Sequence, residues 1–194
     1  GKVLIDGDII AYRAAFSTEQ MGLSDTKAKV DDLIEFILDK TVLFPEIGLD
    51  YVVYLTGKGN FRHDIAKSHV YKGNRKNVQK PSIDKDMLQI PCWHFNIVRG
   101  DYLKVEPFGG IKFFYKQILT GDRADNIVGL WKVGEVKASK ILDGAETEEE
   151  LWDRVIKAYD GDEERVTENA RLLWLRREEA EIWQPPRVRS DNRR

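Results

Sequence analysis

Three segments near the N-terminus follow one another in an order that constrains the fold more than any other feature. Residues 2–5 form a short apolar run that ends at Asp6 and Asp8. Apolar residues then recur at i, i+3, i+4 and i+7 from Val30 onward, which predicts an amphipathic helix over residues 27–44, and residues 51–55 form a second β-rich run. Strand, helix and strand in this order predict a βαβ unit and a parallel sheet, whose ligand site lies at the carboxyl ends of the strands. We therefore expect an α/β fold in which Asp6 faces a site.

The amino-acid composition excludes several classes of protein. The chain has 194 residues, of which 42% are hydrophobic and 33% charged, so it can bury a core and is not a disordered or fibrous chain. The single cysteine, Cys92, excludes an internal disulfide and a multi-cysteine zinc site and suits a reducing compartment. No apolar run approaches the roughly 20 residues of a membrane span, and the first residues lack the uncharged core of a secretory signal. We expect a cytoplasmic protein without a membrane partner.

The remaining sequence predicts a hairpin followed by helices. The hairpin is expected over residues 93–105, with its turn at residues 99–101. Thr147 and Glu150 form a capping box, which indicates the start of a helix that reaches about residue 159. Further helices are expected over residues 111–119 and 166–175, and on both sides of a tight glycine-bounded turn at residues 129–134, the second ending near residue 142. We expect an α/β core over residues 1–102, a helical region over 103–184 and a flexible basic tail over 185–194.

A basic segment follows the second expected strand. Between Lys58 and Lys80 there are seven Lys or Arg residues and one acid, Asp64. Phe61 and Tyr71 lie among these basic residues, and such a mixture suits contacts with phosphates. A charged run is equally typical of an ordinary solvated surface. The residues alone leave both interpretations open.

Acidic residues occur in pairs at the ends of expected elements. Carboxylates that converge on one site raise each other's pKa unless a cation lies between them, and Mg²⁺ is a cation that carboxylates bind. Two such ions could activate water and stabilise the leaving oxygen of a phosphodiester. A single Asp after a strand is more often a turn residue or a helix N-cap, but three pairs in one small chain favour a metal site. The pairs are Asp6 and Asp8, Asp84 and Asp86, and Asp122 and Asp125, the last pair being expected on one helical face.

Four stretches of the sequence resemble, in order, the conserved blocks of the 5′-nuclease family. They read LIDGDIIAYRAAF, GKGNFRHDIAKSHVYKGNRK, DKDMLQIP and GDRADNIVGLWKVGEVKASKIL, and the phage-type 5′→3′ exonucleases are the most similar branch. The resemblance implies a PIN-like fold, with a mostly parallel central sheet flanked by helices and a C-terminal helix-turn-helix-like clamp that grips duplex DNA. It also implies Mg²⁺- or Mn²⁺-dependent hydrolysis of DNA near 5′ ends, on duplex, flap or nicked substrates. A monomer in the cytoplasm, or in the host cytoplasm for a phage-encoded protein, is expected.

The resemblance also implies roles for individual residues. Asp6 would bind the first metal ion, and Asp84, Asp86, Asp122 and Asp125 would bind or position the second. Asp8 is a further expected metal ligand, at a position where many relatives have no acid. Lys72 and Arg75 would act with Asp6 in catalysis by steering the scissile phosphate. A K⁺ ion is expected in the turn of the clamp. The DNA-binding residues would be Arg62, Lys72, Arg75, Lys76, Gly129, Lys132, Gly134, Lys137 and Lys140.

The sequence departs from the family at two places. The loop after the second expected strand has no acid, and the acid-rich segment that relatives carry before Asp84 is missing, since Lys80-Pro81 leads directly into Ser82. Too little sequence is left there to form the strand that should precede Asp84. We therefore expect the natural polypeptide to be longer, with a further acidic segment between Lys80 and Ser82. Two other functions remain open, a DNA-junction-binding protein that has lost catalysis and a small metal-dependent ribonuclease.

Overall fold

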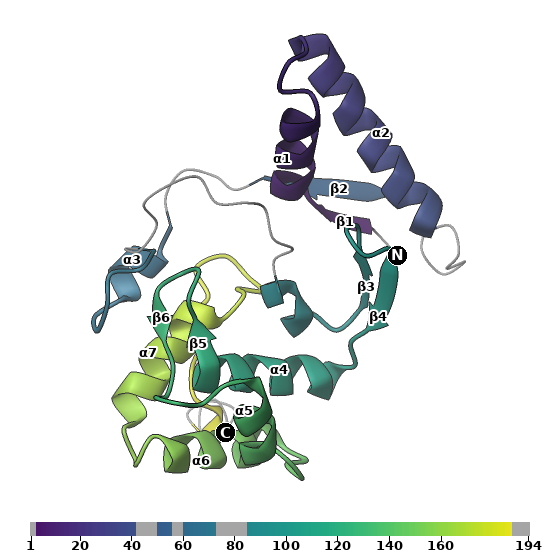
Figure 1. Cartoon of the computed structure of the whole chain (residues 1–194). Coiled ribbons are helices and arrows are strands. Elements are labelled where there is room, and N and C mark those ends of the chain that lie inside the picture. The colour runs from purple at the N-terminus through teal and green to yellow at the C-terminus, as the bar shows by residue number, and fades with distance from the viewer. Residues whose placement is uncertain (1–2, 42–49, 56–59, 73–84, 188–194) are drawn as a thin grey trace. The chain divides into compact units, whose positions relative to one another are not determined.

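The computed structural model describes residues 3–41, 50–55, 60–72 and 85–187 (Figure 1). The described part of the chain contains seven α-helices and three two-stranded sheets, so the protein is mixed α/β. No helix among these residues combines the length and apolar composition needed to cross a membrane. Arg75, Lys76, Asp84 and the gap expected between Lys80 and Ser82 lie outside the described residues.

The chain divides into two compact units. The described residues of the first unit are 3–41, 50–55 and 95–102, and those of the second are 60–72, 85–94 and 103–187. The division assigns residues 60–72 and 85–94 to the second unit, whereas the sequence placed them in the N-terminal core. Ser68 contacts Glu168, 100 residues further along the chain, and Gln89 contacts Gln117 and Leu173, 28 and 84 residues further along. Local sequence patterns do not reveal such contacts.

In the first unit, two strands and two helices follow the expected βαβ order. Strand β1 (Val3–Asp6) pairs in parallel with β2 (Tyr51–Tyr54), so that Val3 lies opposite Tyr51 and Asp6 opposite Tyr54. Helix α1 (Gly7–Ser17) follows β1 directly and packs against α2 (Leu23–Thr41). The parallel pairing confirms the sequence prediction. Within the described residues, however, each strand pairs with one other strand, so the expected single central sheet is not formed by them.

A small apolar core holds the first unit together. Ile5 of β1, Ile10 of α1 and Ile37 of α2 are buried, and Phe95 and Ile97 pack against them. A side chain on Gly7 would lie 2.7 Å from the carbonyl oxygen of Tyr54, so glycine is needed where α1 begins beside β2. Apolar residues at helical spacing in α2 therefore meet a strand face, as the amphipathic pattern indicated.

A hairpin joins the two units along the chain. Strands β3 (Trp93–Asn96) and β4 (Asp101–Lys104) pair with each other, and residues 95–102 belong to the first unit. The Asn96 side chain accepts hydrogen bonds from the backbone N–H groups of Val98 and Arg99, and Gly100 adopts a φ of 73°. The turn therefore occupies residues 97–100 rather than 99–101, because the Asn96 side chain initiates it.

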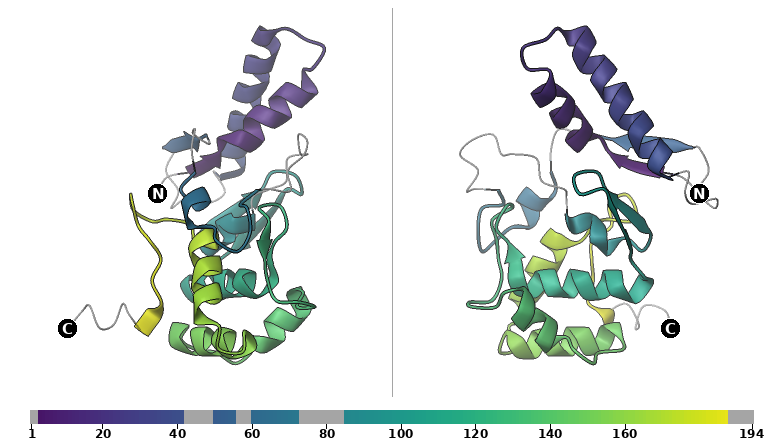
Figure 2. Two further views of the ribbon diagram at one scale, coloured as in Figure 1. Left: turned by 90° about the vertical axis from the view of Figure 1, so that its left-hand side faces the viewer. Right: turned by 45° about the vertical axis from the view of Figure 1, so that its right-hand side comes forward.

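In the second unit, most of the other helices pack against α4 (Pro107–Thr120) (Figures 1 and 2). Phe114, Tyr115, Ile118 and Leu119 of α4 are buried in the core of this unit. The helix begins four residues before the expected position, because Pro107 fits the first turn of a helix. The elements packed around it or around each other are α3 (Arg62–Ile65), the 3₁₀ helix η1 (Lys85–Gln89), α5 (Glu135–Ile141), α6 (Glu148–Ala158) and α7 (Glu163–Leu173).

Side-chain caps fix where α6 and α7 begin. The Thr147 hydroxyl accepts a hydrogen bond from the N–H of Glu150 at 3.2 Å, which confirms the predicted start of α6. Asp162 accepts from the N–H of Arg165 at 3.1 Å, so α7 begins at Glu163, three residues earlier than expected.

The segment after α4 differs most from the sequence prediction. Asp122 and Asp125 were expected on one helical face, but residues 121–128 form an antiparallel hairpin of β5 (Gly121–Asp122) and β6 (Ile127–Val128). Gly121 has a φ of 69°, and a side chain there would lie within 3.0 Å of backbone atoms of Ile127 and Gly129. The left-handed conformation of Gly121 therefore ends α4 and allows β6 to return beside it. A strand, not a helix, precedes the turn at residues 129–134.

The beginning of the expected tail is packed on the second unit. Pro185 and Pro186 are buried, and Arg187 forms an ion pair with Asp153 of α6. Trp183, two residues before, is buried against Phe114 with ring centroids 5.7 Å apart. These apolar and ionic contacts hold residues 183–187, so a flexible tail cannot begin at residue 185.

Candidate nucleic-acid interface

Asp6 lies at the carboxyl end of β1, as the parallel sheet predicted. Its Oδ1 accepts hydrogen bonds from the N–H groups of Asp8 at 3.1 Å and Ile9 at 3.4 Å. Asp6 is therefore the N-cap of α1, and Asp8 lies exposed in the first turn of that helix. The capping role accounts for Asp6 structurally. Asp6 and Asp8 belong to the first unit, whereas Asp86, Asp122 and Asp125 belong to the second.

Asp122 is almost fully buried, with 7% of its surface exposed. Its Oδ1 accepts a hydrogen bond from the N–H of Ala124 at 2.7 Å, and its Oδ2 lies 3.5 Å from the ammonium nitrogen of Lys85. The first contact tightens the turn between β5 and β6. The second balances the carboxylate charge, and sequence analysis did not assign any role to Lys85.

Asp125 contacts the basic segment. The Tyr71 hydroxyl donates to Asp125 Oδ2 at 2.6 Å, Lys72 Nζ lies 3.8 Å from Oδ1, and the Lys72 N–H donates to the Asp125 carbonyl at 2.8 Å. Burial raises the pKa of the Tyr71 phenol, and its hydrogen bond to the Asp125 carboxylate raises the pKa further. Lys72 has a φ of 56°, a strained conformation that these contacts stabilise. Tyr71, Lys72 and Asp125 thus form one connected group.

Asp86 lies on η1 and is bound by a neighbouring helix. The Gln117 side-chain amide of α4 donates to Asp86 Oδ1 at 2.5 Å. Among the residues that the structure describes, no three His, Cys, Asp or Glu side chains lie close enough together to hold one metal ion. The described acids do not by themselves fit a metal site, and Asp84 lies outside them.

Hydrogen bonds attach residues 60–72 to the end of α7 and to the hairpin at residues 121–128. Arg62 Nε donates to the carbonyl of Leu172 at 2.6 Å, and its Nη2 donates to the carbonyl of Trp174 at 3.2 Å. Asn126 donates from its side chain to the carbonyl of Val70 at 2.8 Å. The sequence predicted a phosphate contact for Arg62, but two of its nitrogens satisfy carbonyl groups where α7 ends.

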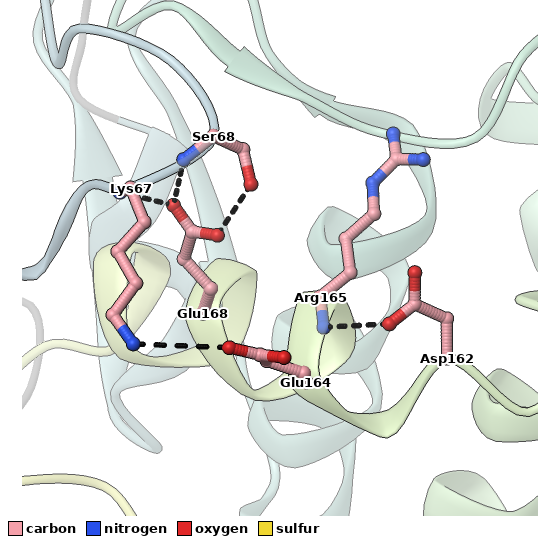
Figure 3. A pocket seen from close by; sticks show the side chains of 6 residues that line it. All are labelled: Lys67, Ser68, Asp162, Glu164, Arg165 and Glu168. Atoms are coloured by element: carbon pink, nitrogen blue, oxygen red, sulfur yellow. Dashed lines mark hydrogen bonds and ion pairs between the residues drawn. The ribbon is translucent and has the colours of Figure 1, made fainter.

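A polar pocket of about 270 Å³ lies beside this contact (Figure 3). Glu168 of α7 accepts hydrogen bonds from the N–H of Lys67 at 2.5 Å and from the N–H and hydroxyl of Ser68 at 2.8 and 2.5 Å. Partial burial alone would raise the pKa of Glu168, but the hydrogen bonds from Ser68 and Lys67 outweigh it and hold the pKa below its ordinary value. Because its side chains bind one another, the pocket is a structural joint between the loop and α7.

The glycine-bounded turn after β6 is held at its base by two helices, α4 and α7. The N–H of Leu130 donates to Leu119 of α4 at 2.8 Å, and Arg165 of α7 donates to the Gly129 carbonyl at 3.1 Å. Asn169 of α7 donates to the Val128 carbonyl at 2.9 Å. A side chain on Gly129 would lie within 3.0 Å of backbone atoms of α4 and Gly121. Glycine is therefore required at this position for the close packing.

The tip of the turn and the exposed face of α5 form a cationic surface. The N–H of Val133 donates to the Leu130 carbonyl at 3.2 Å, which places Trp131 and Lys132 at the two corners of a β-turn. Gly134 is the N-cap of α5, and a Cβ there would have no neighbouring atom within 4 Å. We call this patch the turn–helix surface, and its exposed members are Trp131, Lys132, Val136, Lys137 and Lys140. Sequence analysis assigned its lysines but missed Trp131, whose signal is a tryptophan inside a glycine-bounded turn.

Comparison of the chain with models of protein families, with curated proteins and with solved structures finds no match. The resemblance of the four sequence blocks to 5′-nucleases therefore stays a prediction. The fold and the site define a mixed α/β protein with a rigid, lysine-bearing turn.

Proposed function

We propose that the chain is a divalent-metal-dependent 5′→3′ exonuclease or structure-specific 5′-nuclease that hydrolyses DNA near 5′ ends. In this proposal β1, β2, α1 and α2 are part of a PIN-like core, and the hairpin at 121–128, the following turn and α5 are the DNA clamp. The partner is DNA with a 5′ end. The observation that carries the proposal is the turn–helix surface.

The turn–helix surface has the charge that DNA binding needs. Lys132, Lys137 and Lys140 are exposed, while the nearby acid Glu135 is bound by Lys116, with Oε2 and Nζ 2.6 Å apart. The lysines can release counterions from DNA when they contact phosphates, and the fixed base of the turn reduces the entropy lost on binding.

The resemblance of the sequence blocks, and not the geometry of the described acids, supports the proposed metal ligands, which are Asp6, Asp8, Asp84, Asp86, Asp122 and Asp125. We propose Mg²⁺ or Mn²⁺ as the cofactor, and a K⁺ ion at the turn between Gly129 and Gly134. When bound, divalent ions supply electrostatic stabilisation of a phosphodiester under attack. Lys72 forms an ion pair with Asp125. We propose that Lys72 orients the phosphate together with Arg75 and Lys76.

Cleavage of 5′-labelled duplex and flap DNA, with Mg²⁺ or with EDTA, tests the proposal. Asp122→Asn and Asp125→Asn should lose cleavage but bind DNA equally or more tightly, because each removes a negative charge that repels phosphate. The exposed Asp143, changed to Asn, is the matched control and should retain wild-type activity. Cleavage that persists in EDTA would contradict the metal mechanism.

The salt dependence of binding tests the surface itself. Changing Lys137 or Lys140 to Ala should flatten the slope of log K against log salt by about 0.9 for each lost duplex contact. Lys157, which is exposed on α6, is the control, and its change to Ala should leave the slope unaltered. Equal slopes for all three variants would refute a DNA contact at the turn–helix surface.

A second candidate function has a specific observation in its favour. Lys85 and Lys72 neutralise Asp122 and Asp125, and those acids also hold the local backbone and Tyr71. This arrangement suits a DNA-junction-binding protein without catalysis. Salt-dependent binding through Lys137 and Lys140, without cleavage in Mg²⁺ or Mn²⁺, would establish this second function.

A further inference from the structure

Trp131 is the most exposed large apolar side chain in the described part of the chain, with 84% of its surface accessible. Trp152 and Trp183, by contrast, are 3% exposed in the core of the same unit. Burying a tryptophan is among the larger gains available to a folding chain, so an exposed tryptophan contributes little to stability. This makes Trp131 a candidate for contact with a ligand.

The turn keeps Trp131 at the surface. Trp131 occupies the first corner of the β-turn closed by Val133 and Leu130, and Lys132 occupies the second corner with a φ of 58°. Lys132 Nζ lies 5.8 Å from the centre of the Trp131 ring, a cation–π distance. Because Arg165 and Asn169 fix the base of the turn, the indole is held outward before any ligand arrives.

The charged side chains near Trp131 indicate which class of ligand would bind there. Lys132, Lys137 and Lys140 are exposed near it in the chain, and the charge of Glu135 is offset by Lys116. On α5, Val136 and Lys140 are four residues apart and therefore share a face, away from the buried Ala138. An aromatic ring among lysines matches a polyanion that has flat apolar faces, which is a nucleic acid with unpaired bases.

We propose that Trp131 binds single-stranded DNA by stacking on an unpaired base, while Lys132, Lys137 and Lys140 contact the neighbouring phosphates. The inference rests on the proposed function in taking DNA as the ligand, and it deepens that function by naming DNA with an unpaired segment as the preferred form. Bases inside a duplex are covered by their neighbours on both faces. A stacking side chain therefore distinguishes unpaired or terminal bases from paired ones.

Binding of a labelled oligo(dT) strand to the full chain, in EDTA and at fixed salt, tests the proposal. Trp131→Ala should weaken the affinity about 5- to 160-fold, as expected from the loss of one stacked base. Trp131→Phe, which keeps an aromatic ring, should stay within about threefold of wild type. Ile182→Ala is the control in the same unit, because Ile182 is 52% exposed, has no ring and is not a member of the turn–helix surface.

Two further measurements separate stacking from general attraction. An abasic strand of the same length should bind wild type and Trp131→Ala equally, because it has phosphates but no bases. In a Trp93→Phe background, oligo(dT) should quench tryptophan fluorescence when Trp131 is present but not after Trp131→Phe, since Trp152 and Trp183 are buried and Trp174 is partly buried.

Several outcomes would overturn the proposal. Equal affinities of Trp131→Ala and Ile182→Ala for oligo(dT) would do so, as would an equal loss of affinity of Trp131→Ala for the abasic strand. Self-association that Trp131→Ala abolishes, with DNA affinity unchanged, would show that a second copy covers the ring instead. Metal-dependent cleavage with unaltered binding by Trp131→Ala refutes stacking but leaves the nuclease proposal standing. Ring-dependent binding of oligo(dT) without cleavage refutes the nuclease but supports stacking.

Discussion

Gln89 connects three elements of the second unit through a buried hydrogen-bond network. It is 1% exposed, and its side-chain amide donates at 2.8 Å both to Gln117 of α4 and to the carbonyl of Leu173, the last residue of α7. Its side-chain oxygen accepts from the N–H of Leu175 at 3.2 Å. Gln117 in turn donates to Asp86, so the network also positions a proposed metal ligand.

Gln89→Met keeps the length of the side chain but removes all three hydrogen bonds. The carbonyl of Leu173 and the amide oxygen of Gln117 would remain buried without these donors, at about 1–3 kcal/mol each, and the partly buried N–H of Leu175 adds about 1 kcal/mol. The free energy of unfolding should therefore fall by about 3–7 kcal/mol. Since a domain of this size has only about 5–15 kcal/mol in total, the second unit should be strongly destabilised.

Denaturant unfolding monitored by tryptophan fluorescence measures this change. All five tryptophans, at positions 93, 131, 152, 174 and 183, belong to the second unit, so the signal reports on that unit alone. Gln184→Met is the control, because Gln184 accepts one partly buried hydrogen bond, from Arg171 at 3.3 Å, and its loss should cost about 1 kcal/mol or less. A fall below about 1 kcal/mol for Gln89→Met would refute the network as a determinant of stability.

Two further predictions concern the joint and the turn. Because the pKa of Glu168 is lowered on folding, its contacts stabilise the protein above the ordinary Glu pKa of about 4.3, and this stability is lost as the pH falls through the lower folded value. Glu168→Gln should lose about 1 kcal/mol at neutral pH and have a flatter acid limb in a plot of unfolding free energy against pH, whereas an unchanged limb would contradict the assignment. Gly129→Ala should cost about 2–4 kcal/mol because the new Cβ meets fixed backbone, as measured by thermal unfolding. Gly109→Ala, in open space within α4, should be neutral or stabilising by up to about 1 kcal/mol, and equal effects of the two changes would refute the packing argument.

The elements that sequence analysis predicted well depend on local signals. The parallel pairing of β1 and β2 followed from the order of strand, helix and strand, and the start of α6 followed from the Thr147 capping box. The hairpin at residues 121–128 was missed because helical spacing of Asp122 and Asp125 resembles an amphipathic pattern. The positive φ of Gly121 ends the helix before Asp122. This conformation is required because the backbone of β6 packs against Gly121, a contact that the local sequence does not reveal.

The position of the basic segment could not be predicted, since its partners are distant in sequence. Arg62 binds the carbonyl of Leu172, 110 residues away, and the N–H of Lys67 binds Glu168, 101 residues away. A charged run has the same pattern whether it faces solvent, phosphate or another element of the protein. Only the fold shows that Arg62 completes the hydrogen bonding of α7.

Asp122 and Asp125 show what the spacing of acidic residues in a sequence can and cannot predict. Sequence analysis chose Asp122 and Asp125 for their charge, and the structure places both on one hairpin, although a turn brings them there and not a helix. Asp122 forms an ion pair with Lys85, and Asp125 forms one with Lys72. These two lysines flank residues 73–84 in the sequence. Lys85 lies between Asp84 and Asp86 in the sequence, so the order acid, lysine, acid could have indicated a cation beside the acidic pair. Any ligand that approaches Asp122 therefore meets an ion pair whose charge is already balanced, and a divalent ion would have to compete with Lys85 for that carboxylate.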